Sequence, residues 1–136
     1  MYKTILVPID LSDLDKGKAT IDIAQRLGGD GCRIRLLYVV EDIPTYVAAE
    51  LPTGLVDKSK ANAKTQLDGV AAAAGDNVEV EVRAGHAKTA ILEVANDMAA
   101  DLIIIGSHRP GLQDYLLGST AGRVVRHSTC SVLVVR

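Results

Sequence analysis

The stretch Leu102-Ile103-Ile104-Ile105-Gly106, followed by Ser107-His108-Arg109-Pro110-Gly111, decides the fold. Its apolar run is too short to cross a membrane and ends at a glycine, which is typical of a buried strand that runs into a turn. Gly118-Ser119-Thr120 then opens a predicted helix, and a last apolar strand follows over 131–135. Unpaired N–H groups at the start of such a helix attract anions, so this region predicts a phosphate site.

The rest of the chain repeats the alternation of strand and helix. Strands are predicted over 4–9, 33–40, 78–83, 102–106 and 131–135, and helices over 12–27, 56–74, 88–99 and 118–127. This alternation predicts an α/β fold, a doubly wound five-stranded parallel sheet with helices on both faces, as one domain over residues 1–136. The most apolar strands, the first and the fourth, belong in the centre, and the alternating strand 78–83 belongs at an edge. The predicted strand order is therefore 3-2-1-4-5.

The composition limits the possible functions. The chain has no Trp, no Phe and four Tyr, so Val, Ile, Leu and Ala must form the core. Its formal net charge of −2 lacks the basic excess of proteins that bind a nucleic-acid backbone. We find no apolar run of about 18 residues and no signal-peptide pattern, so we expect a cytoplasmic protein without membrane insertion. Cys32 and Cys130 lack CxxC spacing, which favours apolar side chains over a disulfide or a metal site.

The predicted strand ends indicate where a ligand binds. In a doubly wound sheet, ligands bind outside the carboxyl ends of the strands, where the strand order reverses. Pro8-Ile9 and Asp10 end the first strand and Val39-Val40 ends the second, so both lie near Gly106-Ser107. Asp10 is placed to accept a hydrogen bond from a ribose hydroxyl, and Val39-Val40 offers main-chain groups and an apolar wall to a purine. Alternatively, Asp10 caps the helix that follows, where Ser12-Asp13-Leu14-Asp15 also fits a capping box.

The loop after the fourth strand holds the candidate phosphate ligands. Gly106 permits a backbone conformation that a side chain would obstruct, and Gly118-Ser119-Thr120 offers amides and two hydroxyls. Alternatively, the glycines only turn the chain, and Ser119 or Thr120 is an ordinary helix cap. Arg109 has a fork of donors for phosphate but also fits a solvated loop position. For His108 we favour a loop role or a phosphate hydrogen bond over base catalysis, because no partner group stands at a suitable spacing.

Three segments occur here in an order that is specific to one protein family. They are Ile5-Leu6-Val7-Pro8-Ile9-Asp10, Asp101-Leu102-Ile103-Ile104-Ile105-Gly106-Ser107-His108, and Leu116-Leu117-Gly118-Ser119 with residues 124–136. With them the chain resembles the universal stress proteins over essentially its full length. The resemblance implies an adenine nucleotide alpha hydrolase-like fold, homodimers that pair through the last strand and, in one branch, ATP bound at the strand ends.

The ATP-binding branch of this family carries a glycine, two residues, a second glycine, nine residues, and a glycine followed by Ser or Thr. Gly106 and Gly118-Ser119 match the two ends of that pattern, whereas Arg109 replaces the second glycine and eight residues separate it from Gly118. Gly111 supplies flexibility, and the Ser-His-Arg-Pro sequence resembles a nucleotide-binding variant of the family. The resemblance and the strand ends together predict ATP, with or without Mg²⁺, at Pro8, Ile9, Asp10, Val39, Val40, Gly106, Ser107, His108, Arg109, Gly111, Gly118, Ser119 and Thr120.

Three classes of function are consistent with these patterns. We favour a nucleotide-dependent regulatory protein of the stress response, with a homodimer through strand 131–135 and a protein partner still to be found. An enzyme of the same architecture, such as an ATP pyrophosphatase or a nucleotidyl transferase, would need a Ser-Gly-Gly loop or paired histidines, which the sequence lacks. Slow ATP hydrolysis or autophosphorylation remains open under the resemblance, although we find no convincing nucleophile. The third class is an interaction protein that binds no nucleotide.

Overall fold

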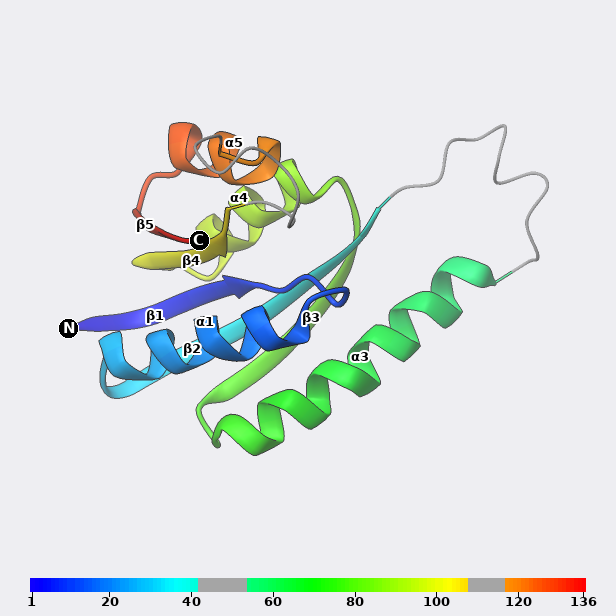
Figure 1. Ribbon diagram of the computed structural model, residues 1–136, viewed down its shortest axis with the longest axis horizontal. Coiled ribbons are helices and arrows are strands. Elements are labelled where there is room, and N and C mark those ends of the chain that lie inside the picture. Colours follow the sequence, from blue (N-terminus) through cyan, green and yellow to red (C-terminus); the bar gives the residue numbers. More distant parts are fainter. Residues whose placement is uncertain (42–53, 108–116) are drawn as a thin grey trace.

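Five parallel strands form one sheet in the order β3-β2-β1-β4-β5 (Figure 1). The computed structural model describes residues 1–41, 54–107 and 117–136. Its elements are β1 (Tyr2–Pro8), α1 (Leu14–Leu27), β2 (Gly28–Glu41), α3 (Leu55–Ala74), β3 (Val78–Gly85), α4 (Ala87–Asp97), β4 (Leu102–Gly106), α5 (Ser119–His127) and β5 (Ser131–Val135). The predicted α/β class and the predicted strand order are both confirmed.

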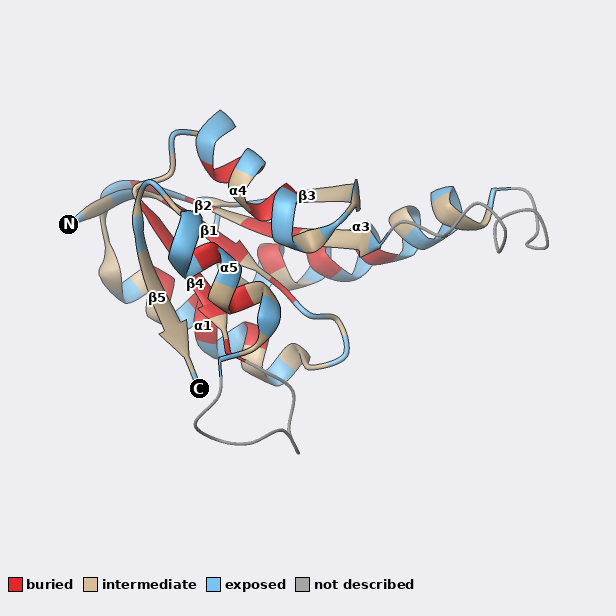
Figure 2. Cartoon of the chain, turned by 90° about the horizontal axis from the view of Figure 1, so that it is seen from above, coloured by how far each residue is buried: buried red, intermediate tan, exposed pale blue. Residues whose placement is uncertain are grey.

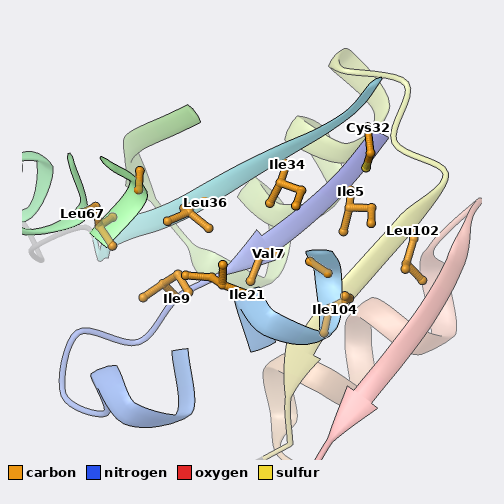
Figure 3. Close-up of a cluster of buried hydrophobic side chains, with 12 residues drawn as sticks. Ile5, Val7, Ile9, Ile21, Cys32, Ile34, Leu36, Leu67, Leu102 and Ile104 are labelled. Carbon is orange, nitrogen blue, oxygen red and sulfur yellow. The ribbon is translucent and has the colours of Figure 1, made fainter. Parts of the chain in front are cut away.

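Helices cover both faces of the sheet, α1 and α3 on one side and α4 and α5 on the other (Figure 1). Ile5 and Val7 of β1 point into the core beneath α1 and α3, while Leu6 points into the core beneath α4 and α5. All three side chains are fully buried, and buried residues fill the central strands (Figure 2). Figure 3 shows the first of these cores, in which side chains of β1, β2 and β4 pack with Ile21 of α1 and Leu67 of α3. A strand covered on both faces explains the unbroken apolar run of β1.

The carboxylate of Asp101 fixes β1 against the segment that enters β4. Its two oxygens accept hydrogen bonds from the amide of Lys3 at 2.8 Å and from the amide of Thr4 at 3.0 Å. The amide of Asp101 in turn donates to the carbonyl of Thr4 at 2.9 Å. These bonds set the register in which Ile5 pairs with Leu102, at the amino ends of the strands.

The edge position predicted for strand 78–83 is confirmed, since β3 is the outermost strand beside β2. Val78, Val80 and Val82 pack against the core beneath α1 and α3. On the opposite face, Arg35 of β2 pairs with Glu79 at 3.1 Å and with Glu81 at 3.0 Å. The alternation in the sequence therefore separates an apolar face from an ion-paired face.

Two local predictions around α1 are wrong. Asp13, not Ser12, caps the helix, since the Asp13 side chain accepts a hydrogen bond from the amide of Lys16 at 3.2 Å. β2 begins at Gly28, directly after the helix, and not at Arg33. The register moves from Tyr2↔Gly28 to Thr4↔Arg33, so β2 bulges there, and Gly31 inside the bulge has a φ of 75°. A positive φ suits glycine, whereas the polar, glycine-rich sequence gave no strand pattern.

Candidate functional site

The end of β1 presents its main chain and Asp10, but not the side chain of Ile9. The amide of Ile9 donates to the carbonyl of Leu37 at 2.8 Å, and Ile9 is 7% exposed. A Cβ added to Gly17 would lie 3.3 Å from Cδ1 of Ile9, so the Ile9 side chain faces α1. Pro8, one residue earlier, is half-buried.

Asp10 closes a tight turn before α1. Its Oδ1 accepts hydrogen bonds from the amide of Ser12 at 2.9 Å and from the hydroxyl of Ser12 at 2.6 Å. The alternative that Asp10 caps α1 is wrong, because Asp13 takes that position. Asp10 is exposed at the carboxyl end of β1, and this turn fixes the orientation of its carboxylate.

Val39-Val40 lies beyond the last pairing between β1 and β2. Pro8 pairs with Leu37, and further along β2 the residues Val39 and Val40 pair with Arg83 and Ala84 of β3. The main-chain edge of Val39-Val40 that faces β1 therefore continues past the end of that strand. The structure thus brings this segment beside the end of β1, where the sequence predicts a purine site.

A hydrogen bond joins the end of β4 to the start of α5. The amide of Gly118 donates to the carbonyl of Ser107 at 2.8 Å, and the amide of Ser107 donates to the carbonyl of Val135 at 3.0 Å. Ser107 is only 2% exposed. The predicted glycines Gly106 and Gly118 are therefore brought together by the backbone of Ser107.

The amino end of α5 carries no side-chain cap. Gly118 is the N-cap residue, and its carbonyl accepts the first helical hydrogen bond, from the amide of Gly122 at 2.8 Å. The alternative in which Ser119 or Thr120 is the cap is wrong. The amides of Ser119 and Thr120 have no partner inside the helix, and they carry the positive end of its dipole. Ser119 is exposed and Thr120 is half-buried.

Gly106 is not required for an unusual backbone conformation, contrary to the prediction. It pairs with Val135 in the sheet, and positive φ values occur instead at other glycines, among them Gly75 and Gly85. A Cβ added to Gly106 would lie 3.5 Å from Cδ and 3.6 Å from Cε of Lys16, which are ordinary contacts. The side chain of Lys16 on α1 therefore covers the end of β4.

A pocket opens at the carboxyl ends of β2 and β3. Its volume of about 390 Å³ lies within the range of roughly 300–1,000 Å³ for ligand sites. It is lined by Glu41, His86, Ala87, Lys88, Thr89, Thr120 and Arg123. The carboxylate of Glu41 accepts a hydrogen bond from the amide of Ala87 at 3.3 Å and lies 3.7 Å from Nδ1 of His86. This contact ties the end of β2 to the start of α4.

Of the pocket residues, only Thr120 was predicted from the sequence. The sequence could also have indicated the pocket residues that follow β3, because ligands bind outside the carboxyl ends of all parallel strands. β3 ends at Gly85, which has a φ of 145° and stands just before His86. Arg123 lies one turn along α5 from Thr120, in a helix whose start was already a candidate. The remaining predicted residues, His108, Arg109 and Gly111, lie outside the described residues.

The described residues contain neither a cluster of metal-binding side chains nor a helix that could span a membrane. Among residues 1–41, 54–107 and 117–136, no group of three or more His, Cys, Asp or Glu side chains could hold a metal ion. Over the same residues, no helix has the length and the apolar character needed to cross a membrane.

Comparison with known proteins identifies the family. The family model described as "Universal stress protein family" matches residues 1–136. Universal stress protein G of Salmonella typhimurium is 32% identical, with both chains covered completely. The structure of the universal stress protein UspA from Lactobacillus plantarum has a TM-score of 0.80 and 30% identity, covering 99% of this chain and 98% of that one.

A universal stress protein solved in complex with cAMP has the same fold, with a TM-score of 0.72 and 24% identity, covering 99% of this chain and 97% of that one. The strand order and the match along the whole sequence agree with one another. This chain belongs to the universal stress protein family.

Proposed function

We propose that the protein binds ATP at the carboxyl ends of β1, β2 and β4 and acts as a nucleotide-dependent regulator in the cytoplasm. One observation carries this proposal, the 2.8 Å hydrogen bond from the amide of Gly118 to the carbonyl of Ser107. It holds the uncapped amino end of α5 against the end of β4. The amides of Ser119 and Thr120, together with the helix dipole, suit the phosphate groups of a nucleotide.

The nucleoside part of the ligand would lie toward β1 and β2. Asp10 is exposed, and its carboxylate is held by the amide and the hydroxyl of Ser12, which suits an acceptor for a ribose hydroxyl. The main-chain edge of Val39-Val40 beyond β1 suits the edge of a purine. Pro8 and Ile9 would contribute main chain, and His108, Arg109 and Gly111 remain proposed ligands from the loop.

The pocket beside α4 and α5 adds support from its chemistry. Lys88 and Arg123 bring two positive charges to it against the one carboxylate of Glu41, and Thr89 and Thr120 bring hydroxyl groups. The two cations and the hydroxyl groups suit a ligand with anionic groups. Any Mg²⁺ would arrive bound to the phosphates, which is how this ion usually enters nucleotide sites. The cAMP complex of a protein with this fold is an analogy at the level of the fold, so the choice of ATP rests on the partial match of Gly106 and Gly118-Ser119 to the glycine pattern of the ATP-binding branch.

The proposal also includes a homodimer that pairs through β5. This strand is the outermost strand on the side of the sheet away from β3. Its residues Val132, Leu133, Val134 and Val135 are only half-buried. An edge strand with partly exposed apolar side chains and unpaired main-chain groups favours pairing with a second copy.

Thermal unfolding with and without ATP and Mg²⁺ tests the binding proposal. ATP at one hundred times its dissociation constant should stabilise the protein by about 2.7 kcal/mol, because it binds the folded state alone. GTP under the same conditions is the control for recognition of the base. Unfolding temperatures that millimolar ATP leaves unchanged would favour an interaction protein without a nucleotide.

A further inference from the structure

Lys16 lies against the candidate site although the sequence gives no motif for it. A Cβ added to Gly106 would lie 4.0 Å from Nζ of Lys16, so the ammonium reaches the end of β4. The next residue, Ser107, accepts the hydrogen bond from Gly118 at the start of α5. The ammonium of Lys16 therefore lies near Gly106, and the amino end of α5 is bonded to the next residue, Ser107.

Local structure does not account for a cation at this position. Lys16 stands in the first turn of α1, where the helix dipole is positive and disfavours a cation. In the described part of the chain, its ammonium has no ion-pair partner. The side chain of Lys16 is half-buried. Its methylene groups cover Gly106, and its ammonium lies at the carboxyl end of β4.

We infer that Lys16 binds the phosphate groups of the nucleotide and so favours phosphorylated ligands over the bare nucleoside. The inference rests on the proposed function and deepens it. An ammonium supplies up to three donors to phosphate oxygens, and the amides at the start of α5 supply donors from a second direction. ATP and ADP should then depend on Lys16, whereas adenosine should not.

The test compares Lys16→Met with the matched variant Lys18→Met. Methionine keeps an unbranched apolar chain over Gly106 but removes the charge. Lys18 is exposed on the same helix, so its variant removes the same charge away from the site. Calorimetric titration with ATP, ADP and adenosine gives the affinities, and thermal unfolding without ligand shows whether each variant folds. Lys16→Arg restores a cation and serves as the rescue.

We expect Lys16→Met to lose about tenfold or more of the ATP affinity, the size typical of one hydrogen bond between charged groups. Adenosine affinity should stay at the wild-type value, Lys18→Met should bind ATP normally, and Lys16→Arg should recover most of the loss. Equal ATP affinity in Lys16→Met and wild type would overturn the inference while the proposed function stands. An equal loss for ATP and adenosine would also overturn it, because a packing role explains that result. If the wild-type protein binds no nucleotide, the proposed function fails and the inference fails with it.

Discussion

The amide of Gly118 donates to the carbonyl of Ser107 at 2.8 Å, although ten residues separate the two positions in the sequence. This bond sets the distance between the end of β4 and the first turn of α5. A side chain at residue 118 would therefore stand at the amino end of the helix, in the space proposed for phosphate. The backbone of Gly118, with φ −59° and ψ 154°, is one that valine also adopts.

Gly118→Val should abolish measurable ATP binding while the protein stays folded, because the side chain fills the phosphate space without straining the backbone. Gly122→Ala is the control on the same helix, since a Cβ there meets nothing within 4 Å. It should leave ATP affinity unchanged and stabilise the protein by about 0.5–1 kcal/mol. Calorimetric titration and urea unfolding measure the two effects. ATP affinity of the wild-type size in Gly118→Val would rule out our placement of the phosphates.

Asp101→Ala should lower the free energy of unfolding by about 2–4 kcal/mol, because the amides of Lys3 and Thr4 lose a charged acceptor. Asp97→Ala is the control, as its side chain is 71% exposed and lies 4.0 Å from Arg83. This exposed pair should contribute less than about 1 kcal/mol. Urea unfolding of both variants gives the comparison. Similar losses in the two would show that the bonds at Asp101 do not hold β1 in place.

Val134→Lys should convert the proposed dimer into a monomer of 14.4 kDa, because a lysine on an edge strand opposes pairing with a second sheet. Val125→Lys is the control, since Val125 is 46% exposed on α5 rather than on β5. Sedimentation at micromolar concentration distinguishes the two states. A monomeric wild-type protein would contradict the proposed dimer directly.

Burial raises the pKa of the Cys32 thiol above its ordinary value of 9.0, and the charge of Asp101 raises it further. The unfolded thiol therefore ionises at a lower pH than the folded one. Its contribution to stability is complete below pH 9.0 and is lost as the pH rises from there through the folded pKa. Cys32→Ala should remove this alkaline loss, whereas Cys130→Ala should retain it. Urea unfolding near neutral pH and above pH 9.0 tests this, and an equal alkaline loss in all three proteins would contradict it.

The strand order was predictable because the pattern of apolar and polar residues in a strand reflects how many of its faces are buried. β4 and residues 5–8 of β1 are apolar, and the buried side chains of both strands reach the cores on the two faces of the sheet, while β3 alternates because its opposite face carries Glu79 and Glu81 in ion pairs with Arg35. The start of β2 was not predicted, because Asp30 and the three glycines around it are uncommon in strands and give no apolar pattern, although β2 begins there with a bulge. The cap of α1 was not predicted because serine and aspartate are similarly good caps. In the structure, the amide and the hydroxyl of Ser12 donate hydrogen bonds to Asp10 instead.

The candidate site was only partly accessible to sequence analysis. The ends of β1, β2 and β4 follow from the topology rule, so the sequence alone predicts Asp10, Val39-Val40 and Gly106. Lys16 was not, because its chain reaches Gly106 only after α1 packs on the sheet. The contact between Glu41 and His86 likewise joins residues that stand far apart in the sequence. Such contacts depend on tertiary packing and leave no local pattern.

The two chain termini lie at opposite ends of the strands (Figure 1). The carbonyl of Val135 accepts the hydrogen bond from Ser107, so Arg136 follows immediately beside the candidate site and the edge of β5. An affinity tag or a fluorescent fusion joined after Arg136 would compete with the proposed nucleotide and with the proposed second copy of the chain. The same fusion placed before Met1 would leave both surfaces accessible, so amino-terminal tags are the right choice for binding and assembly assays.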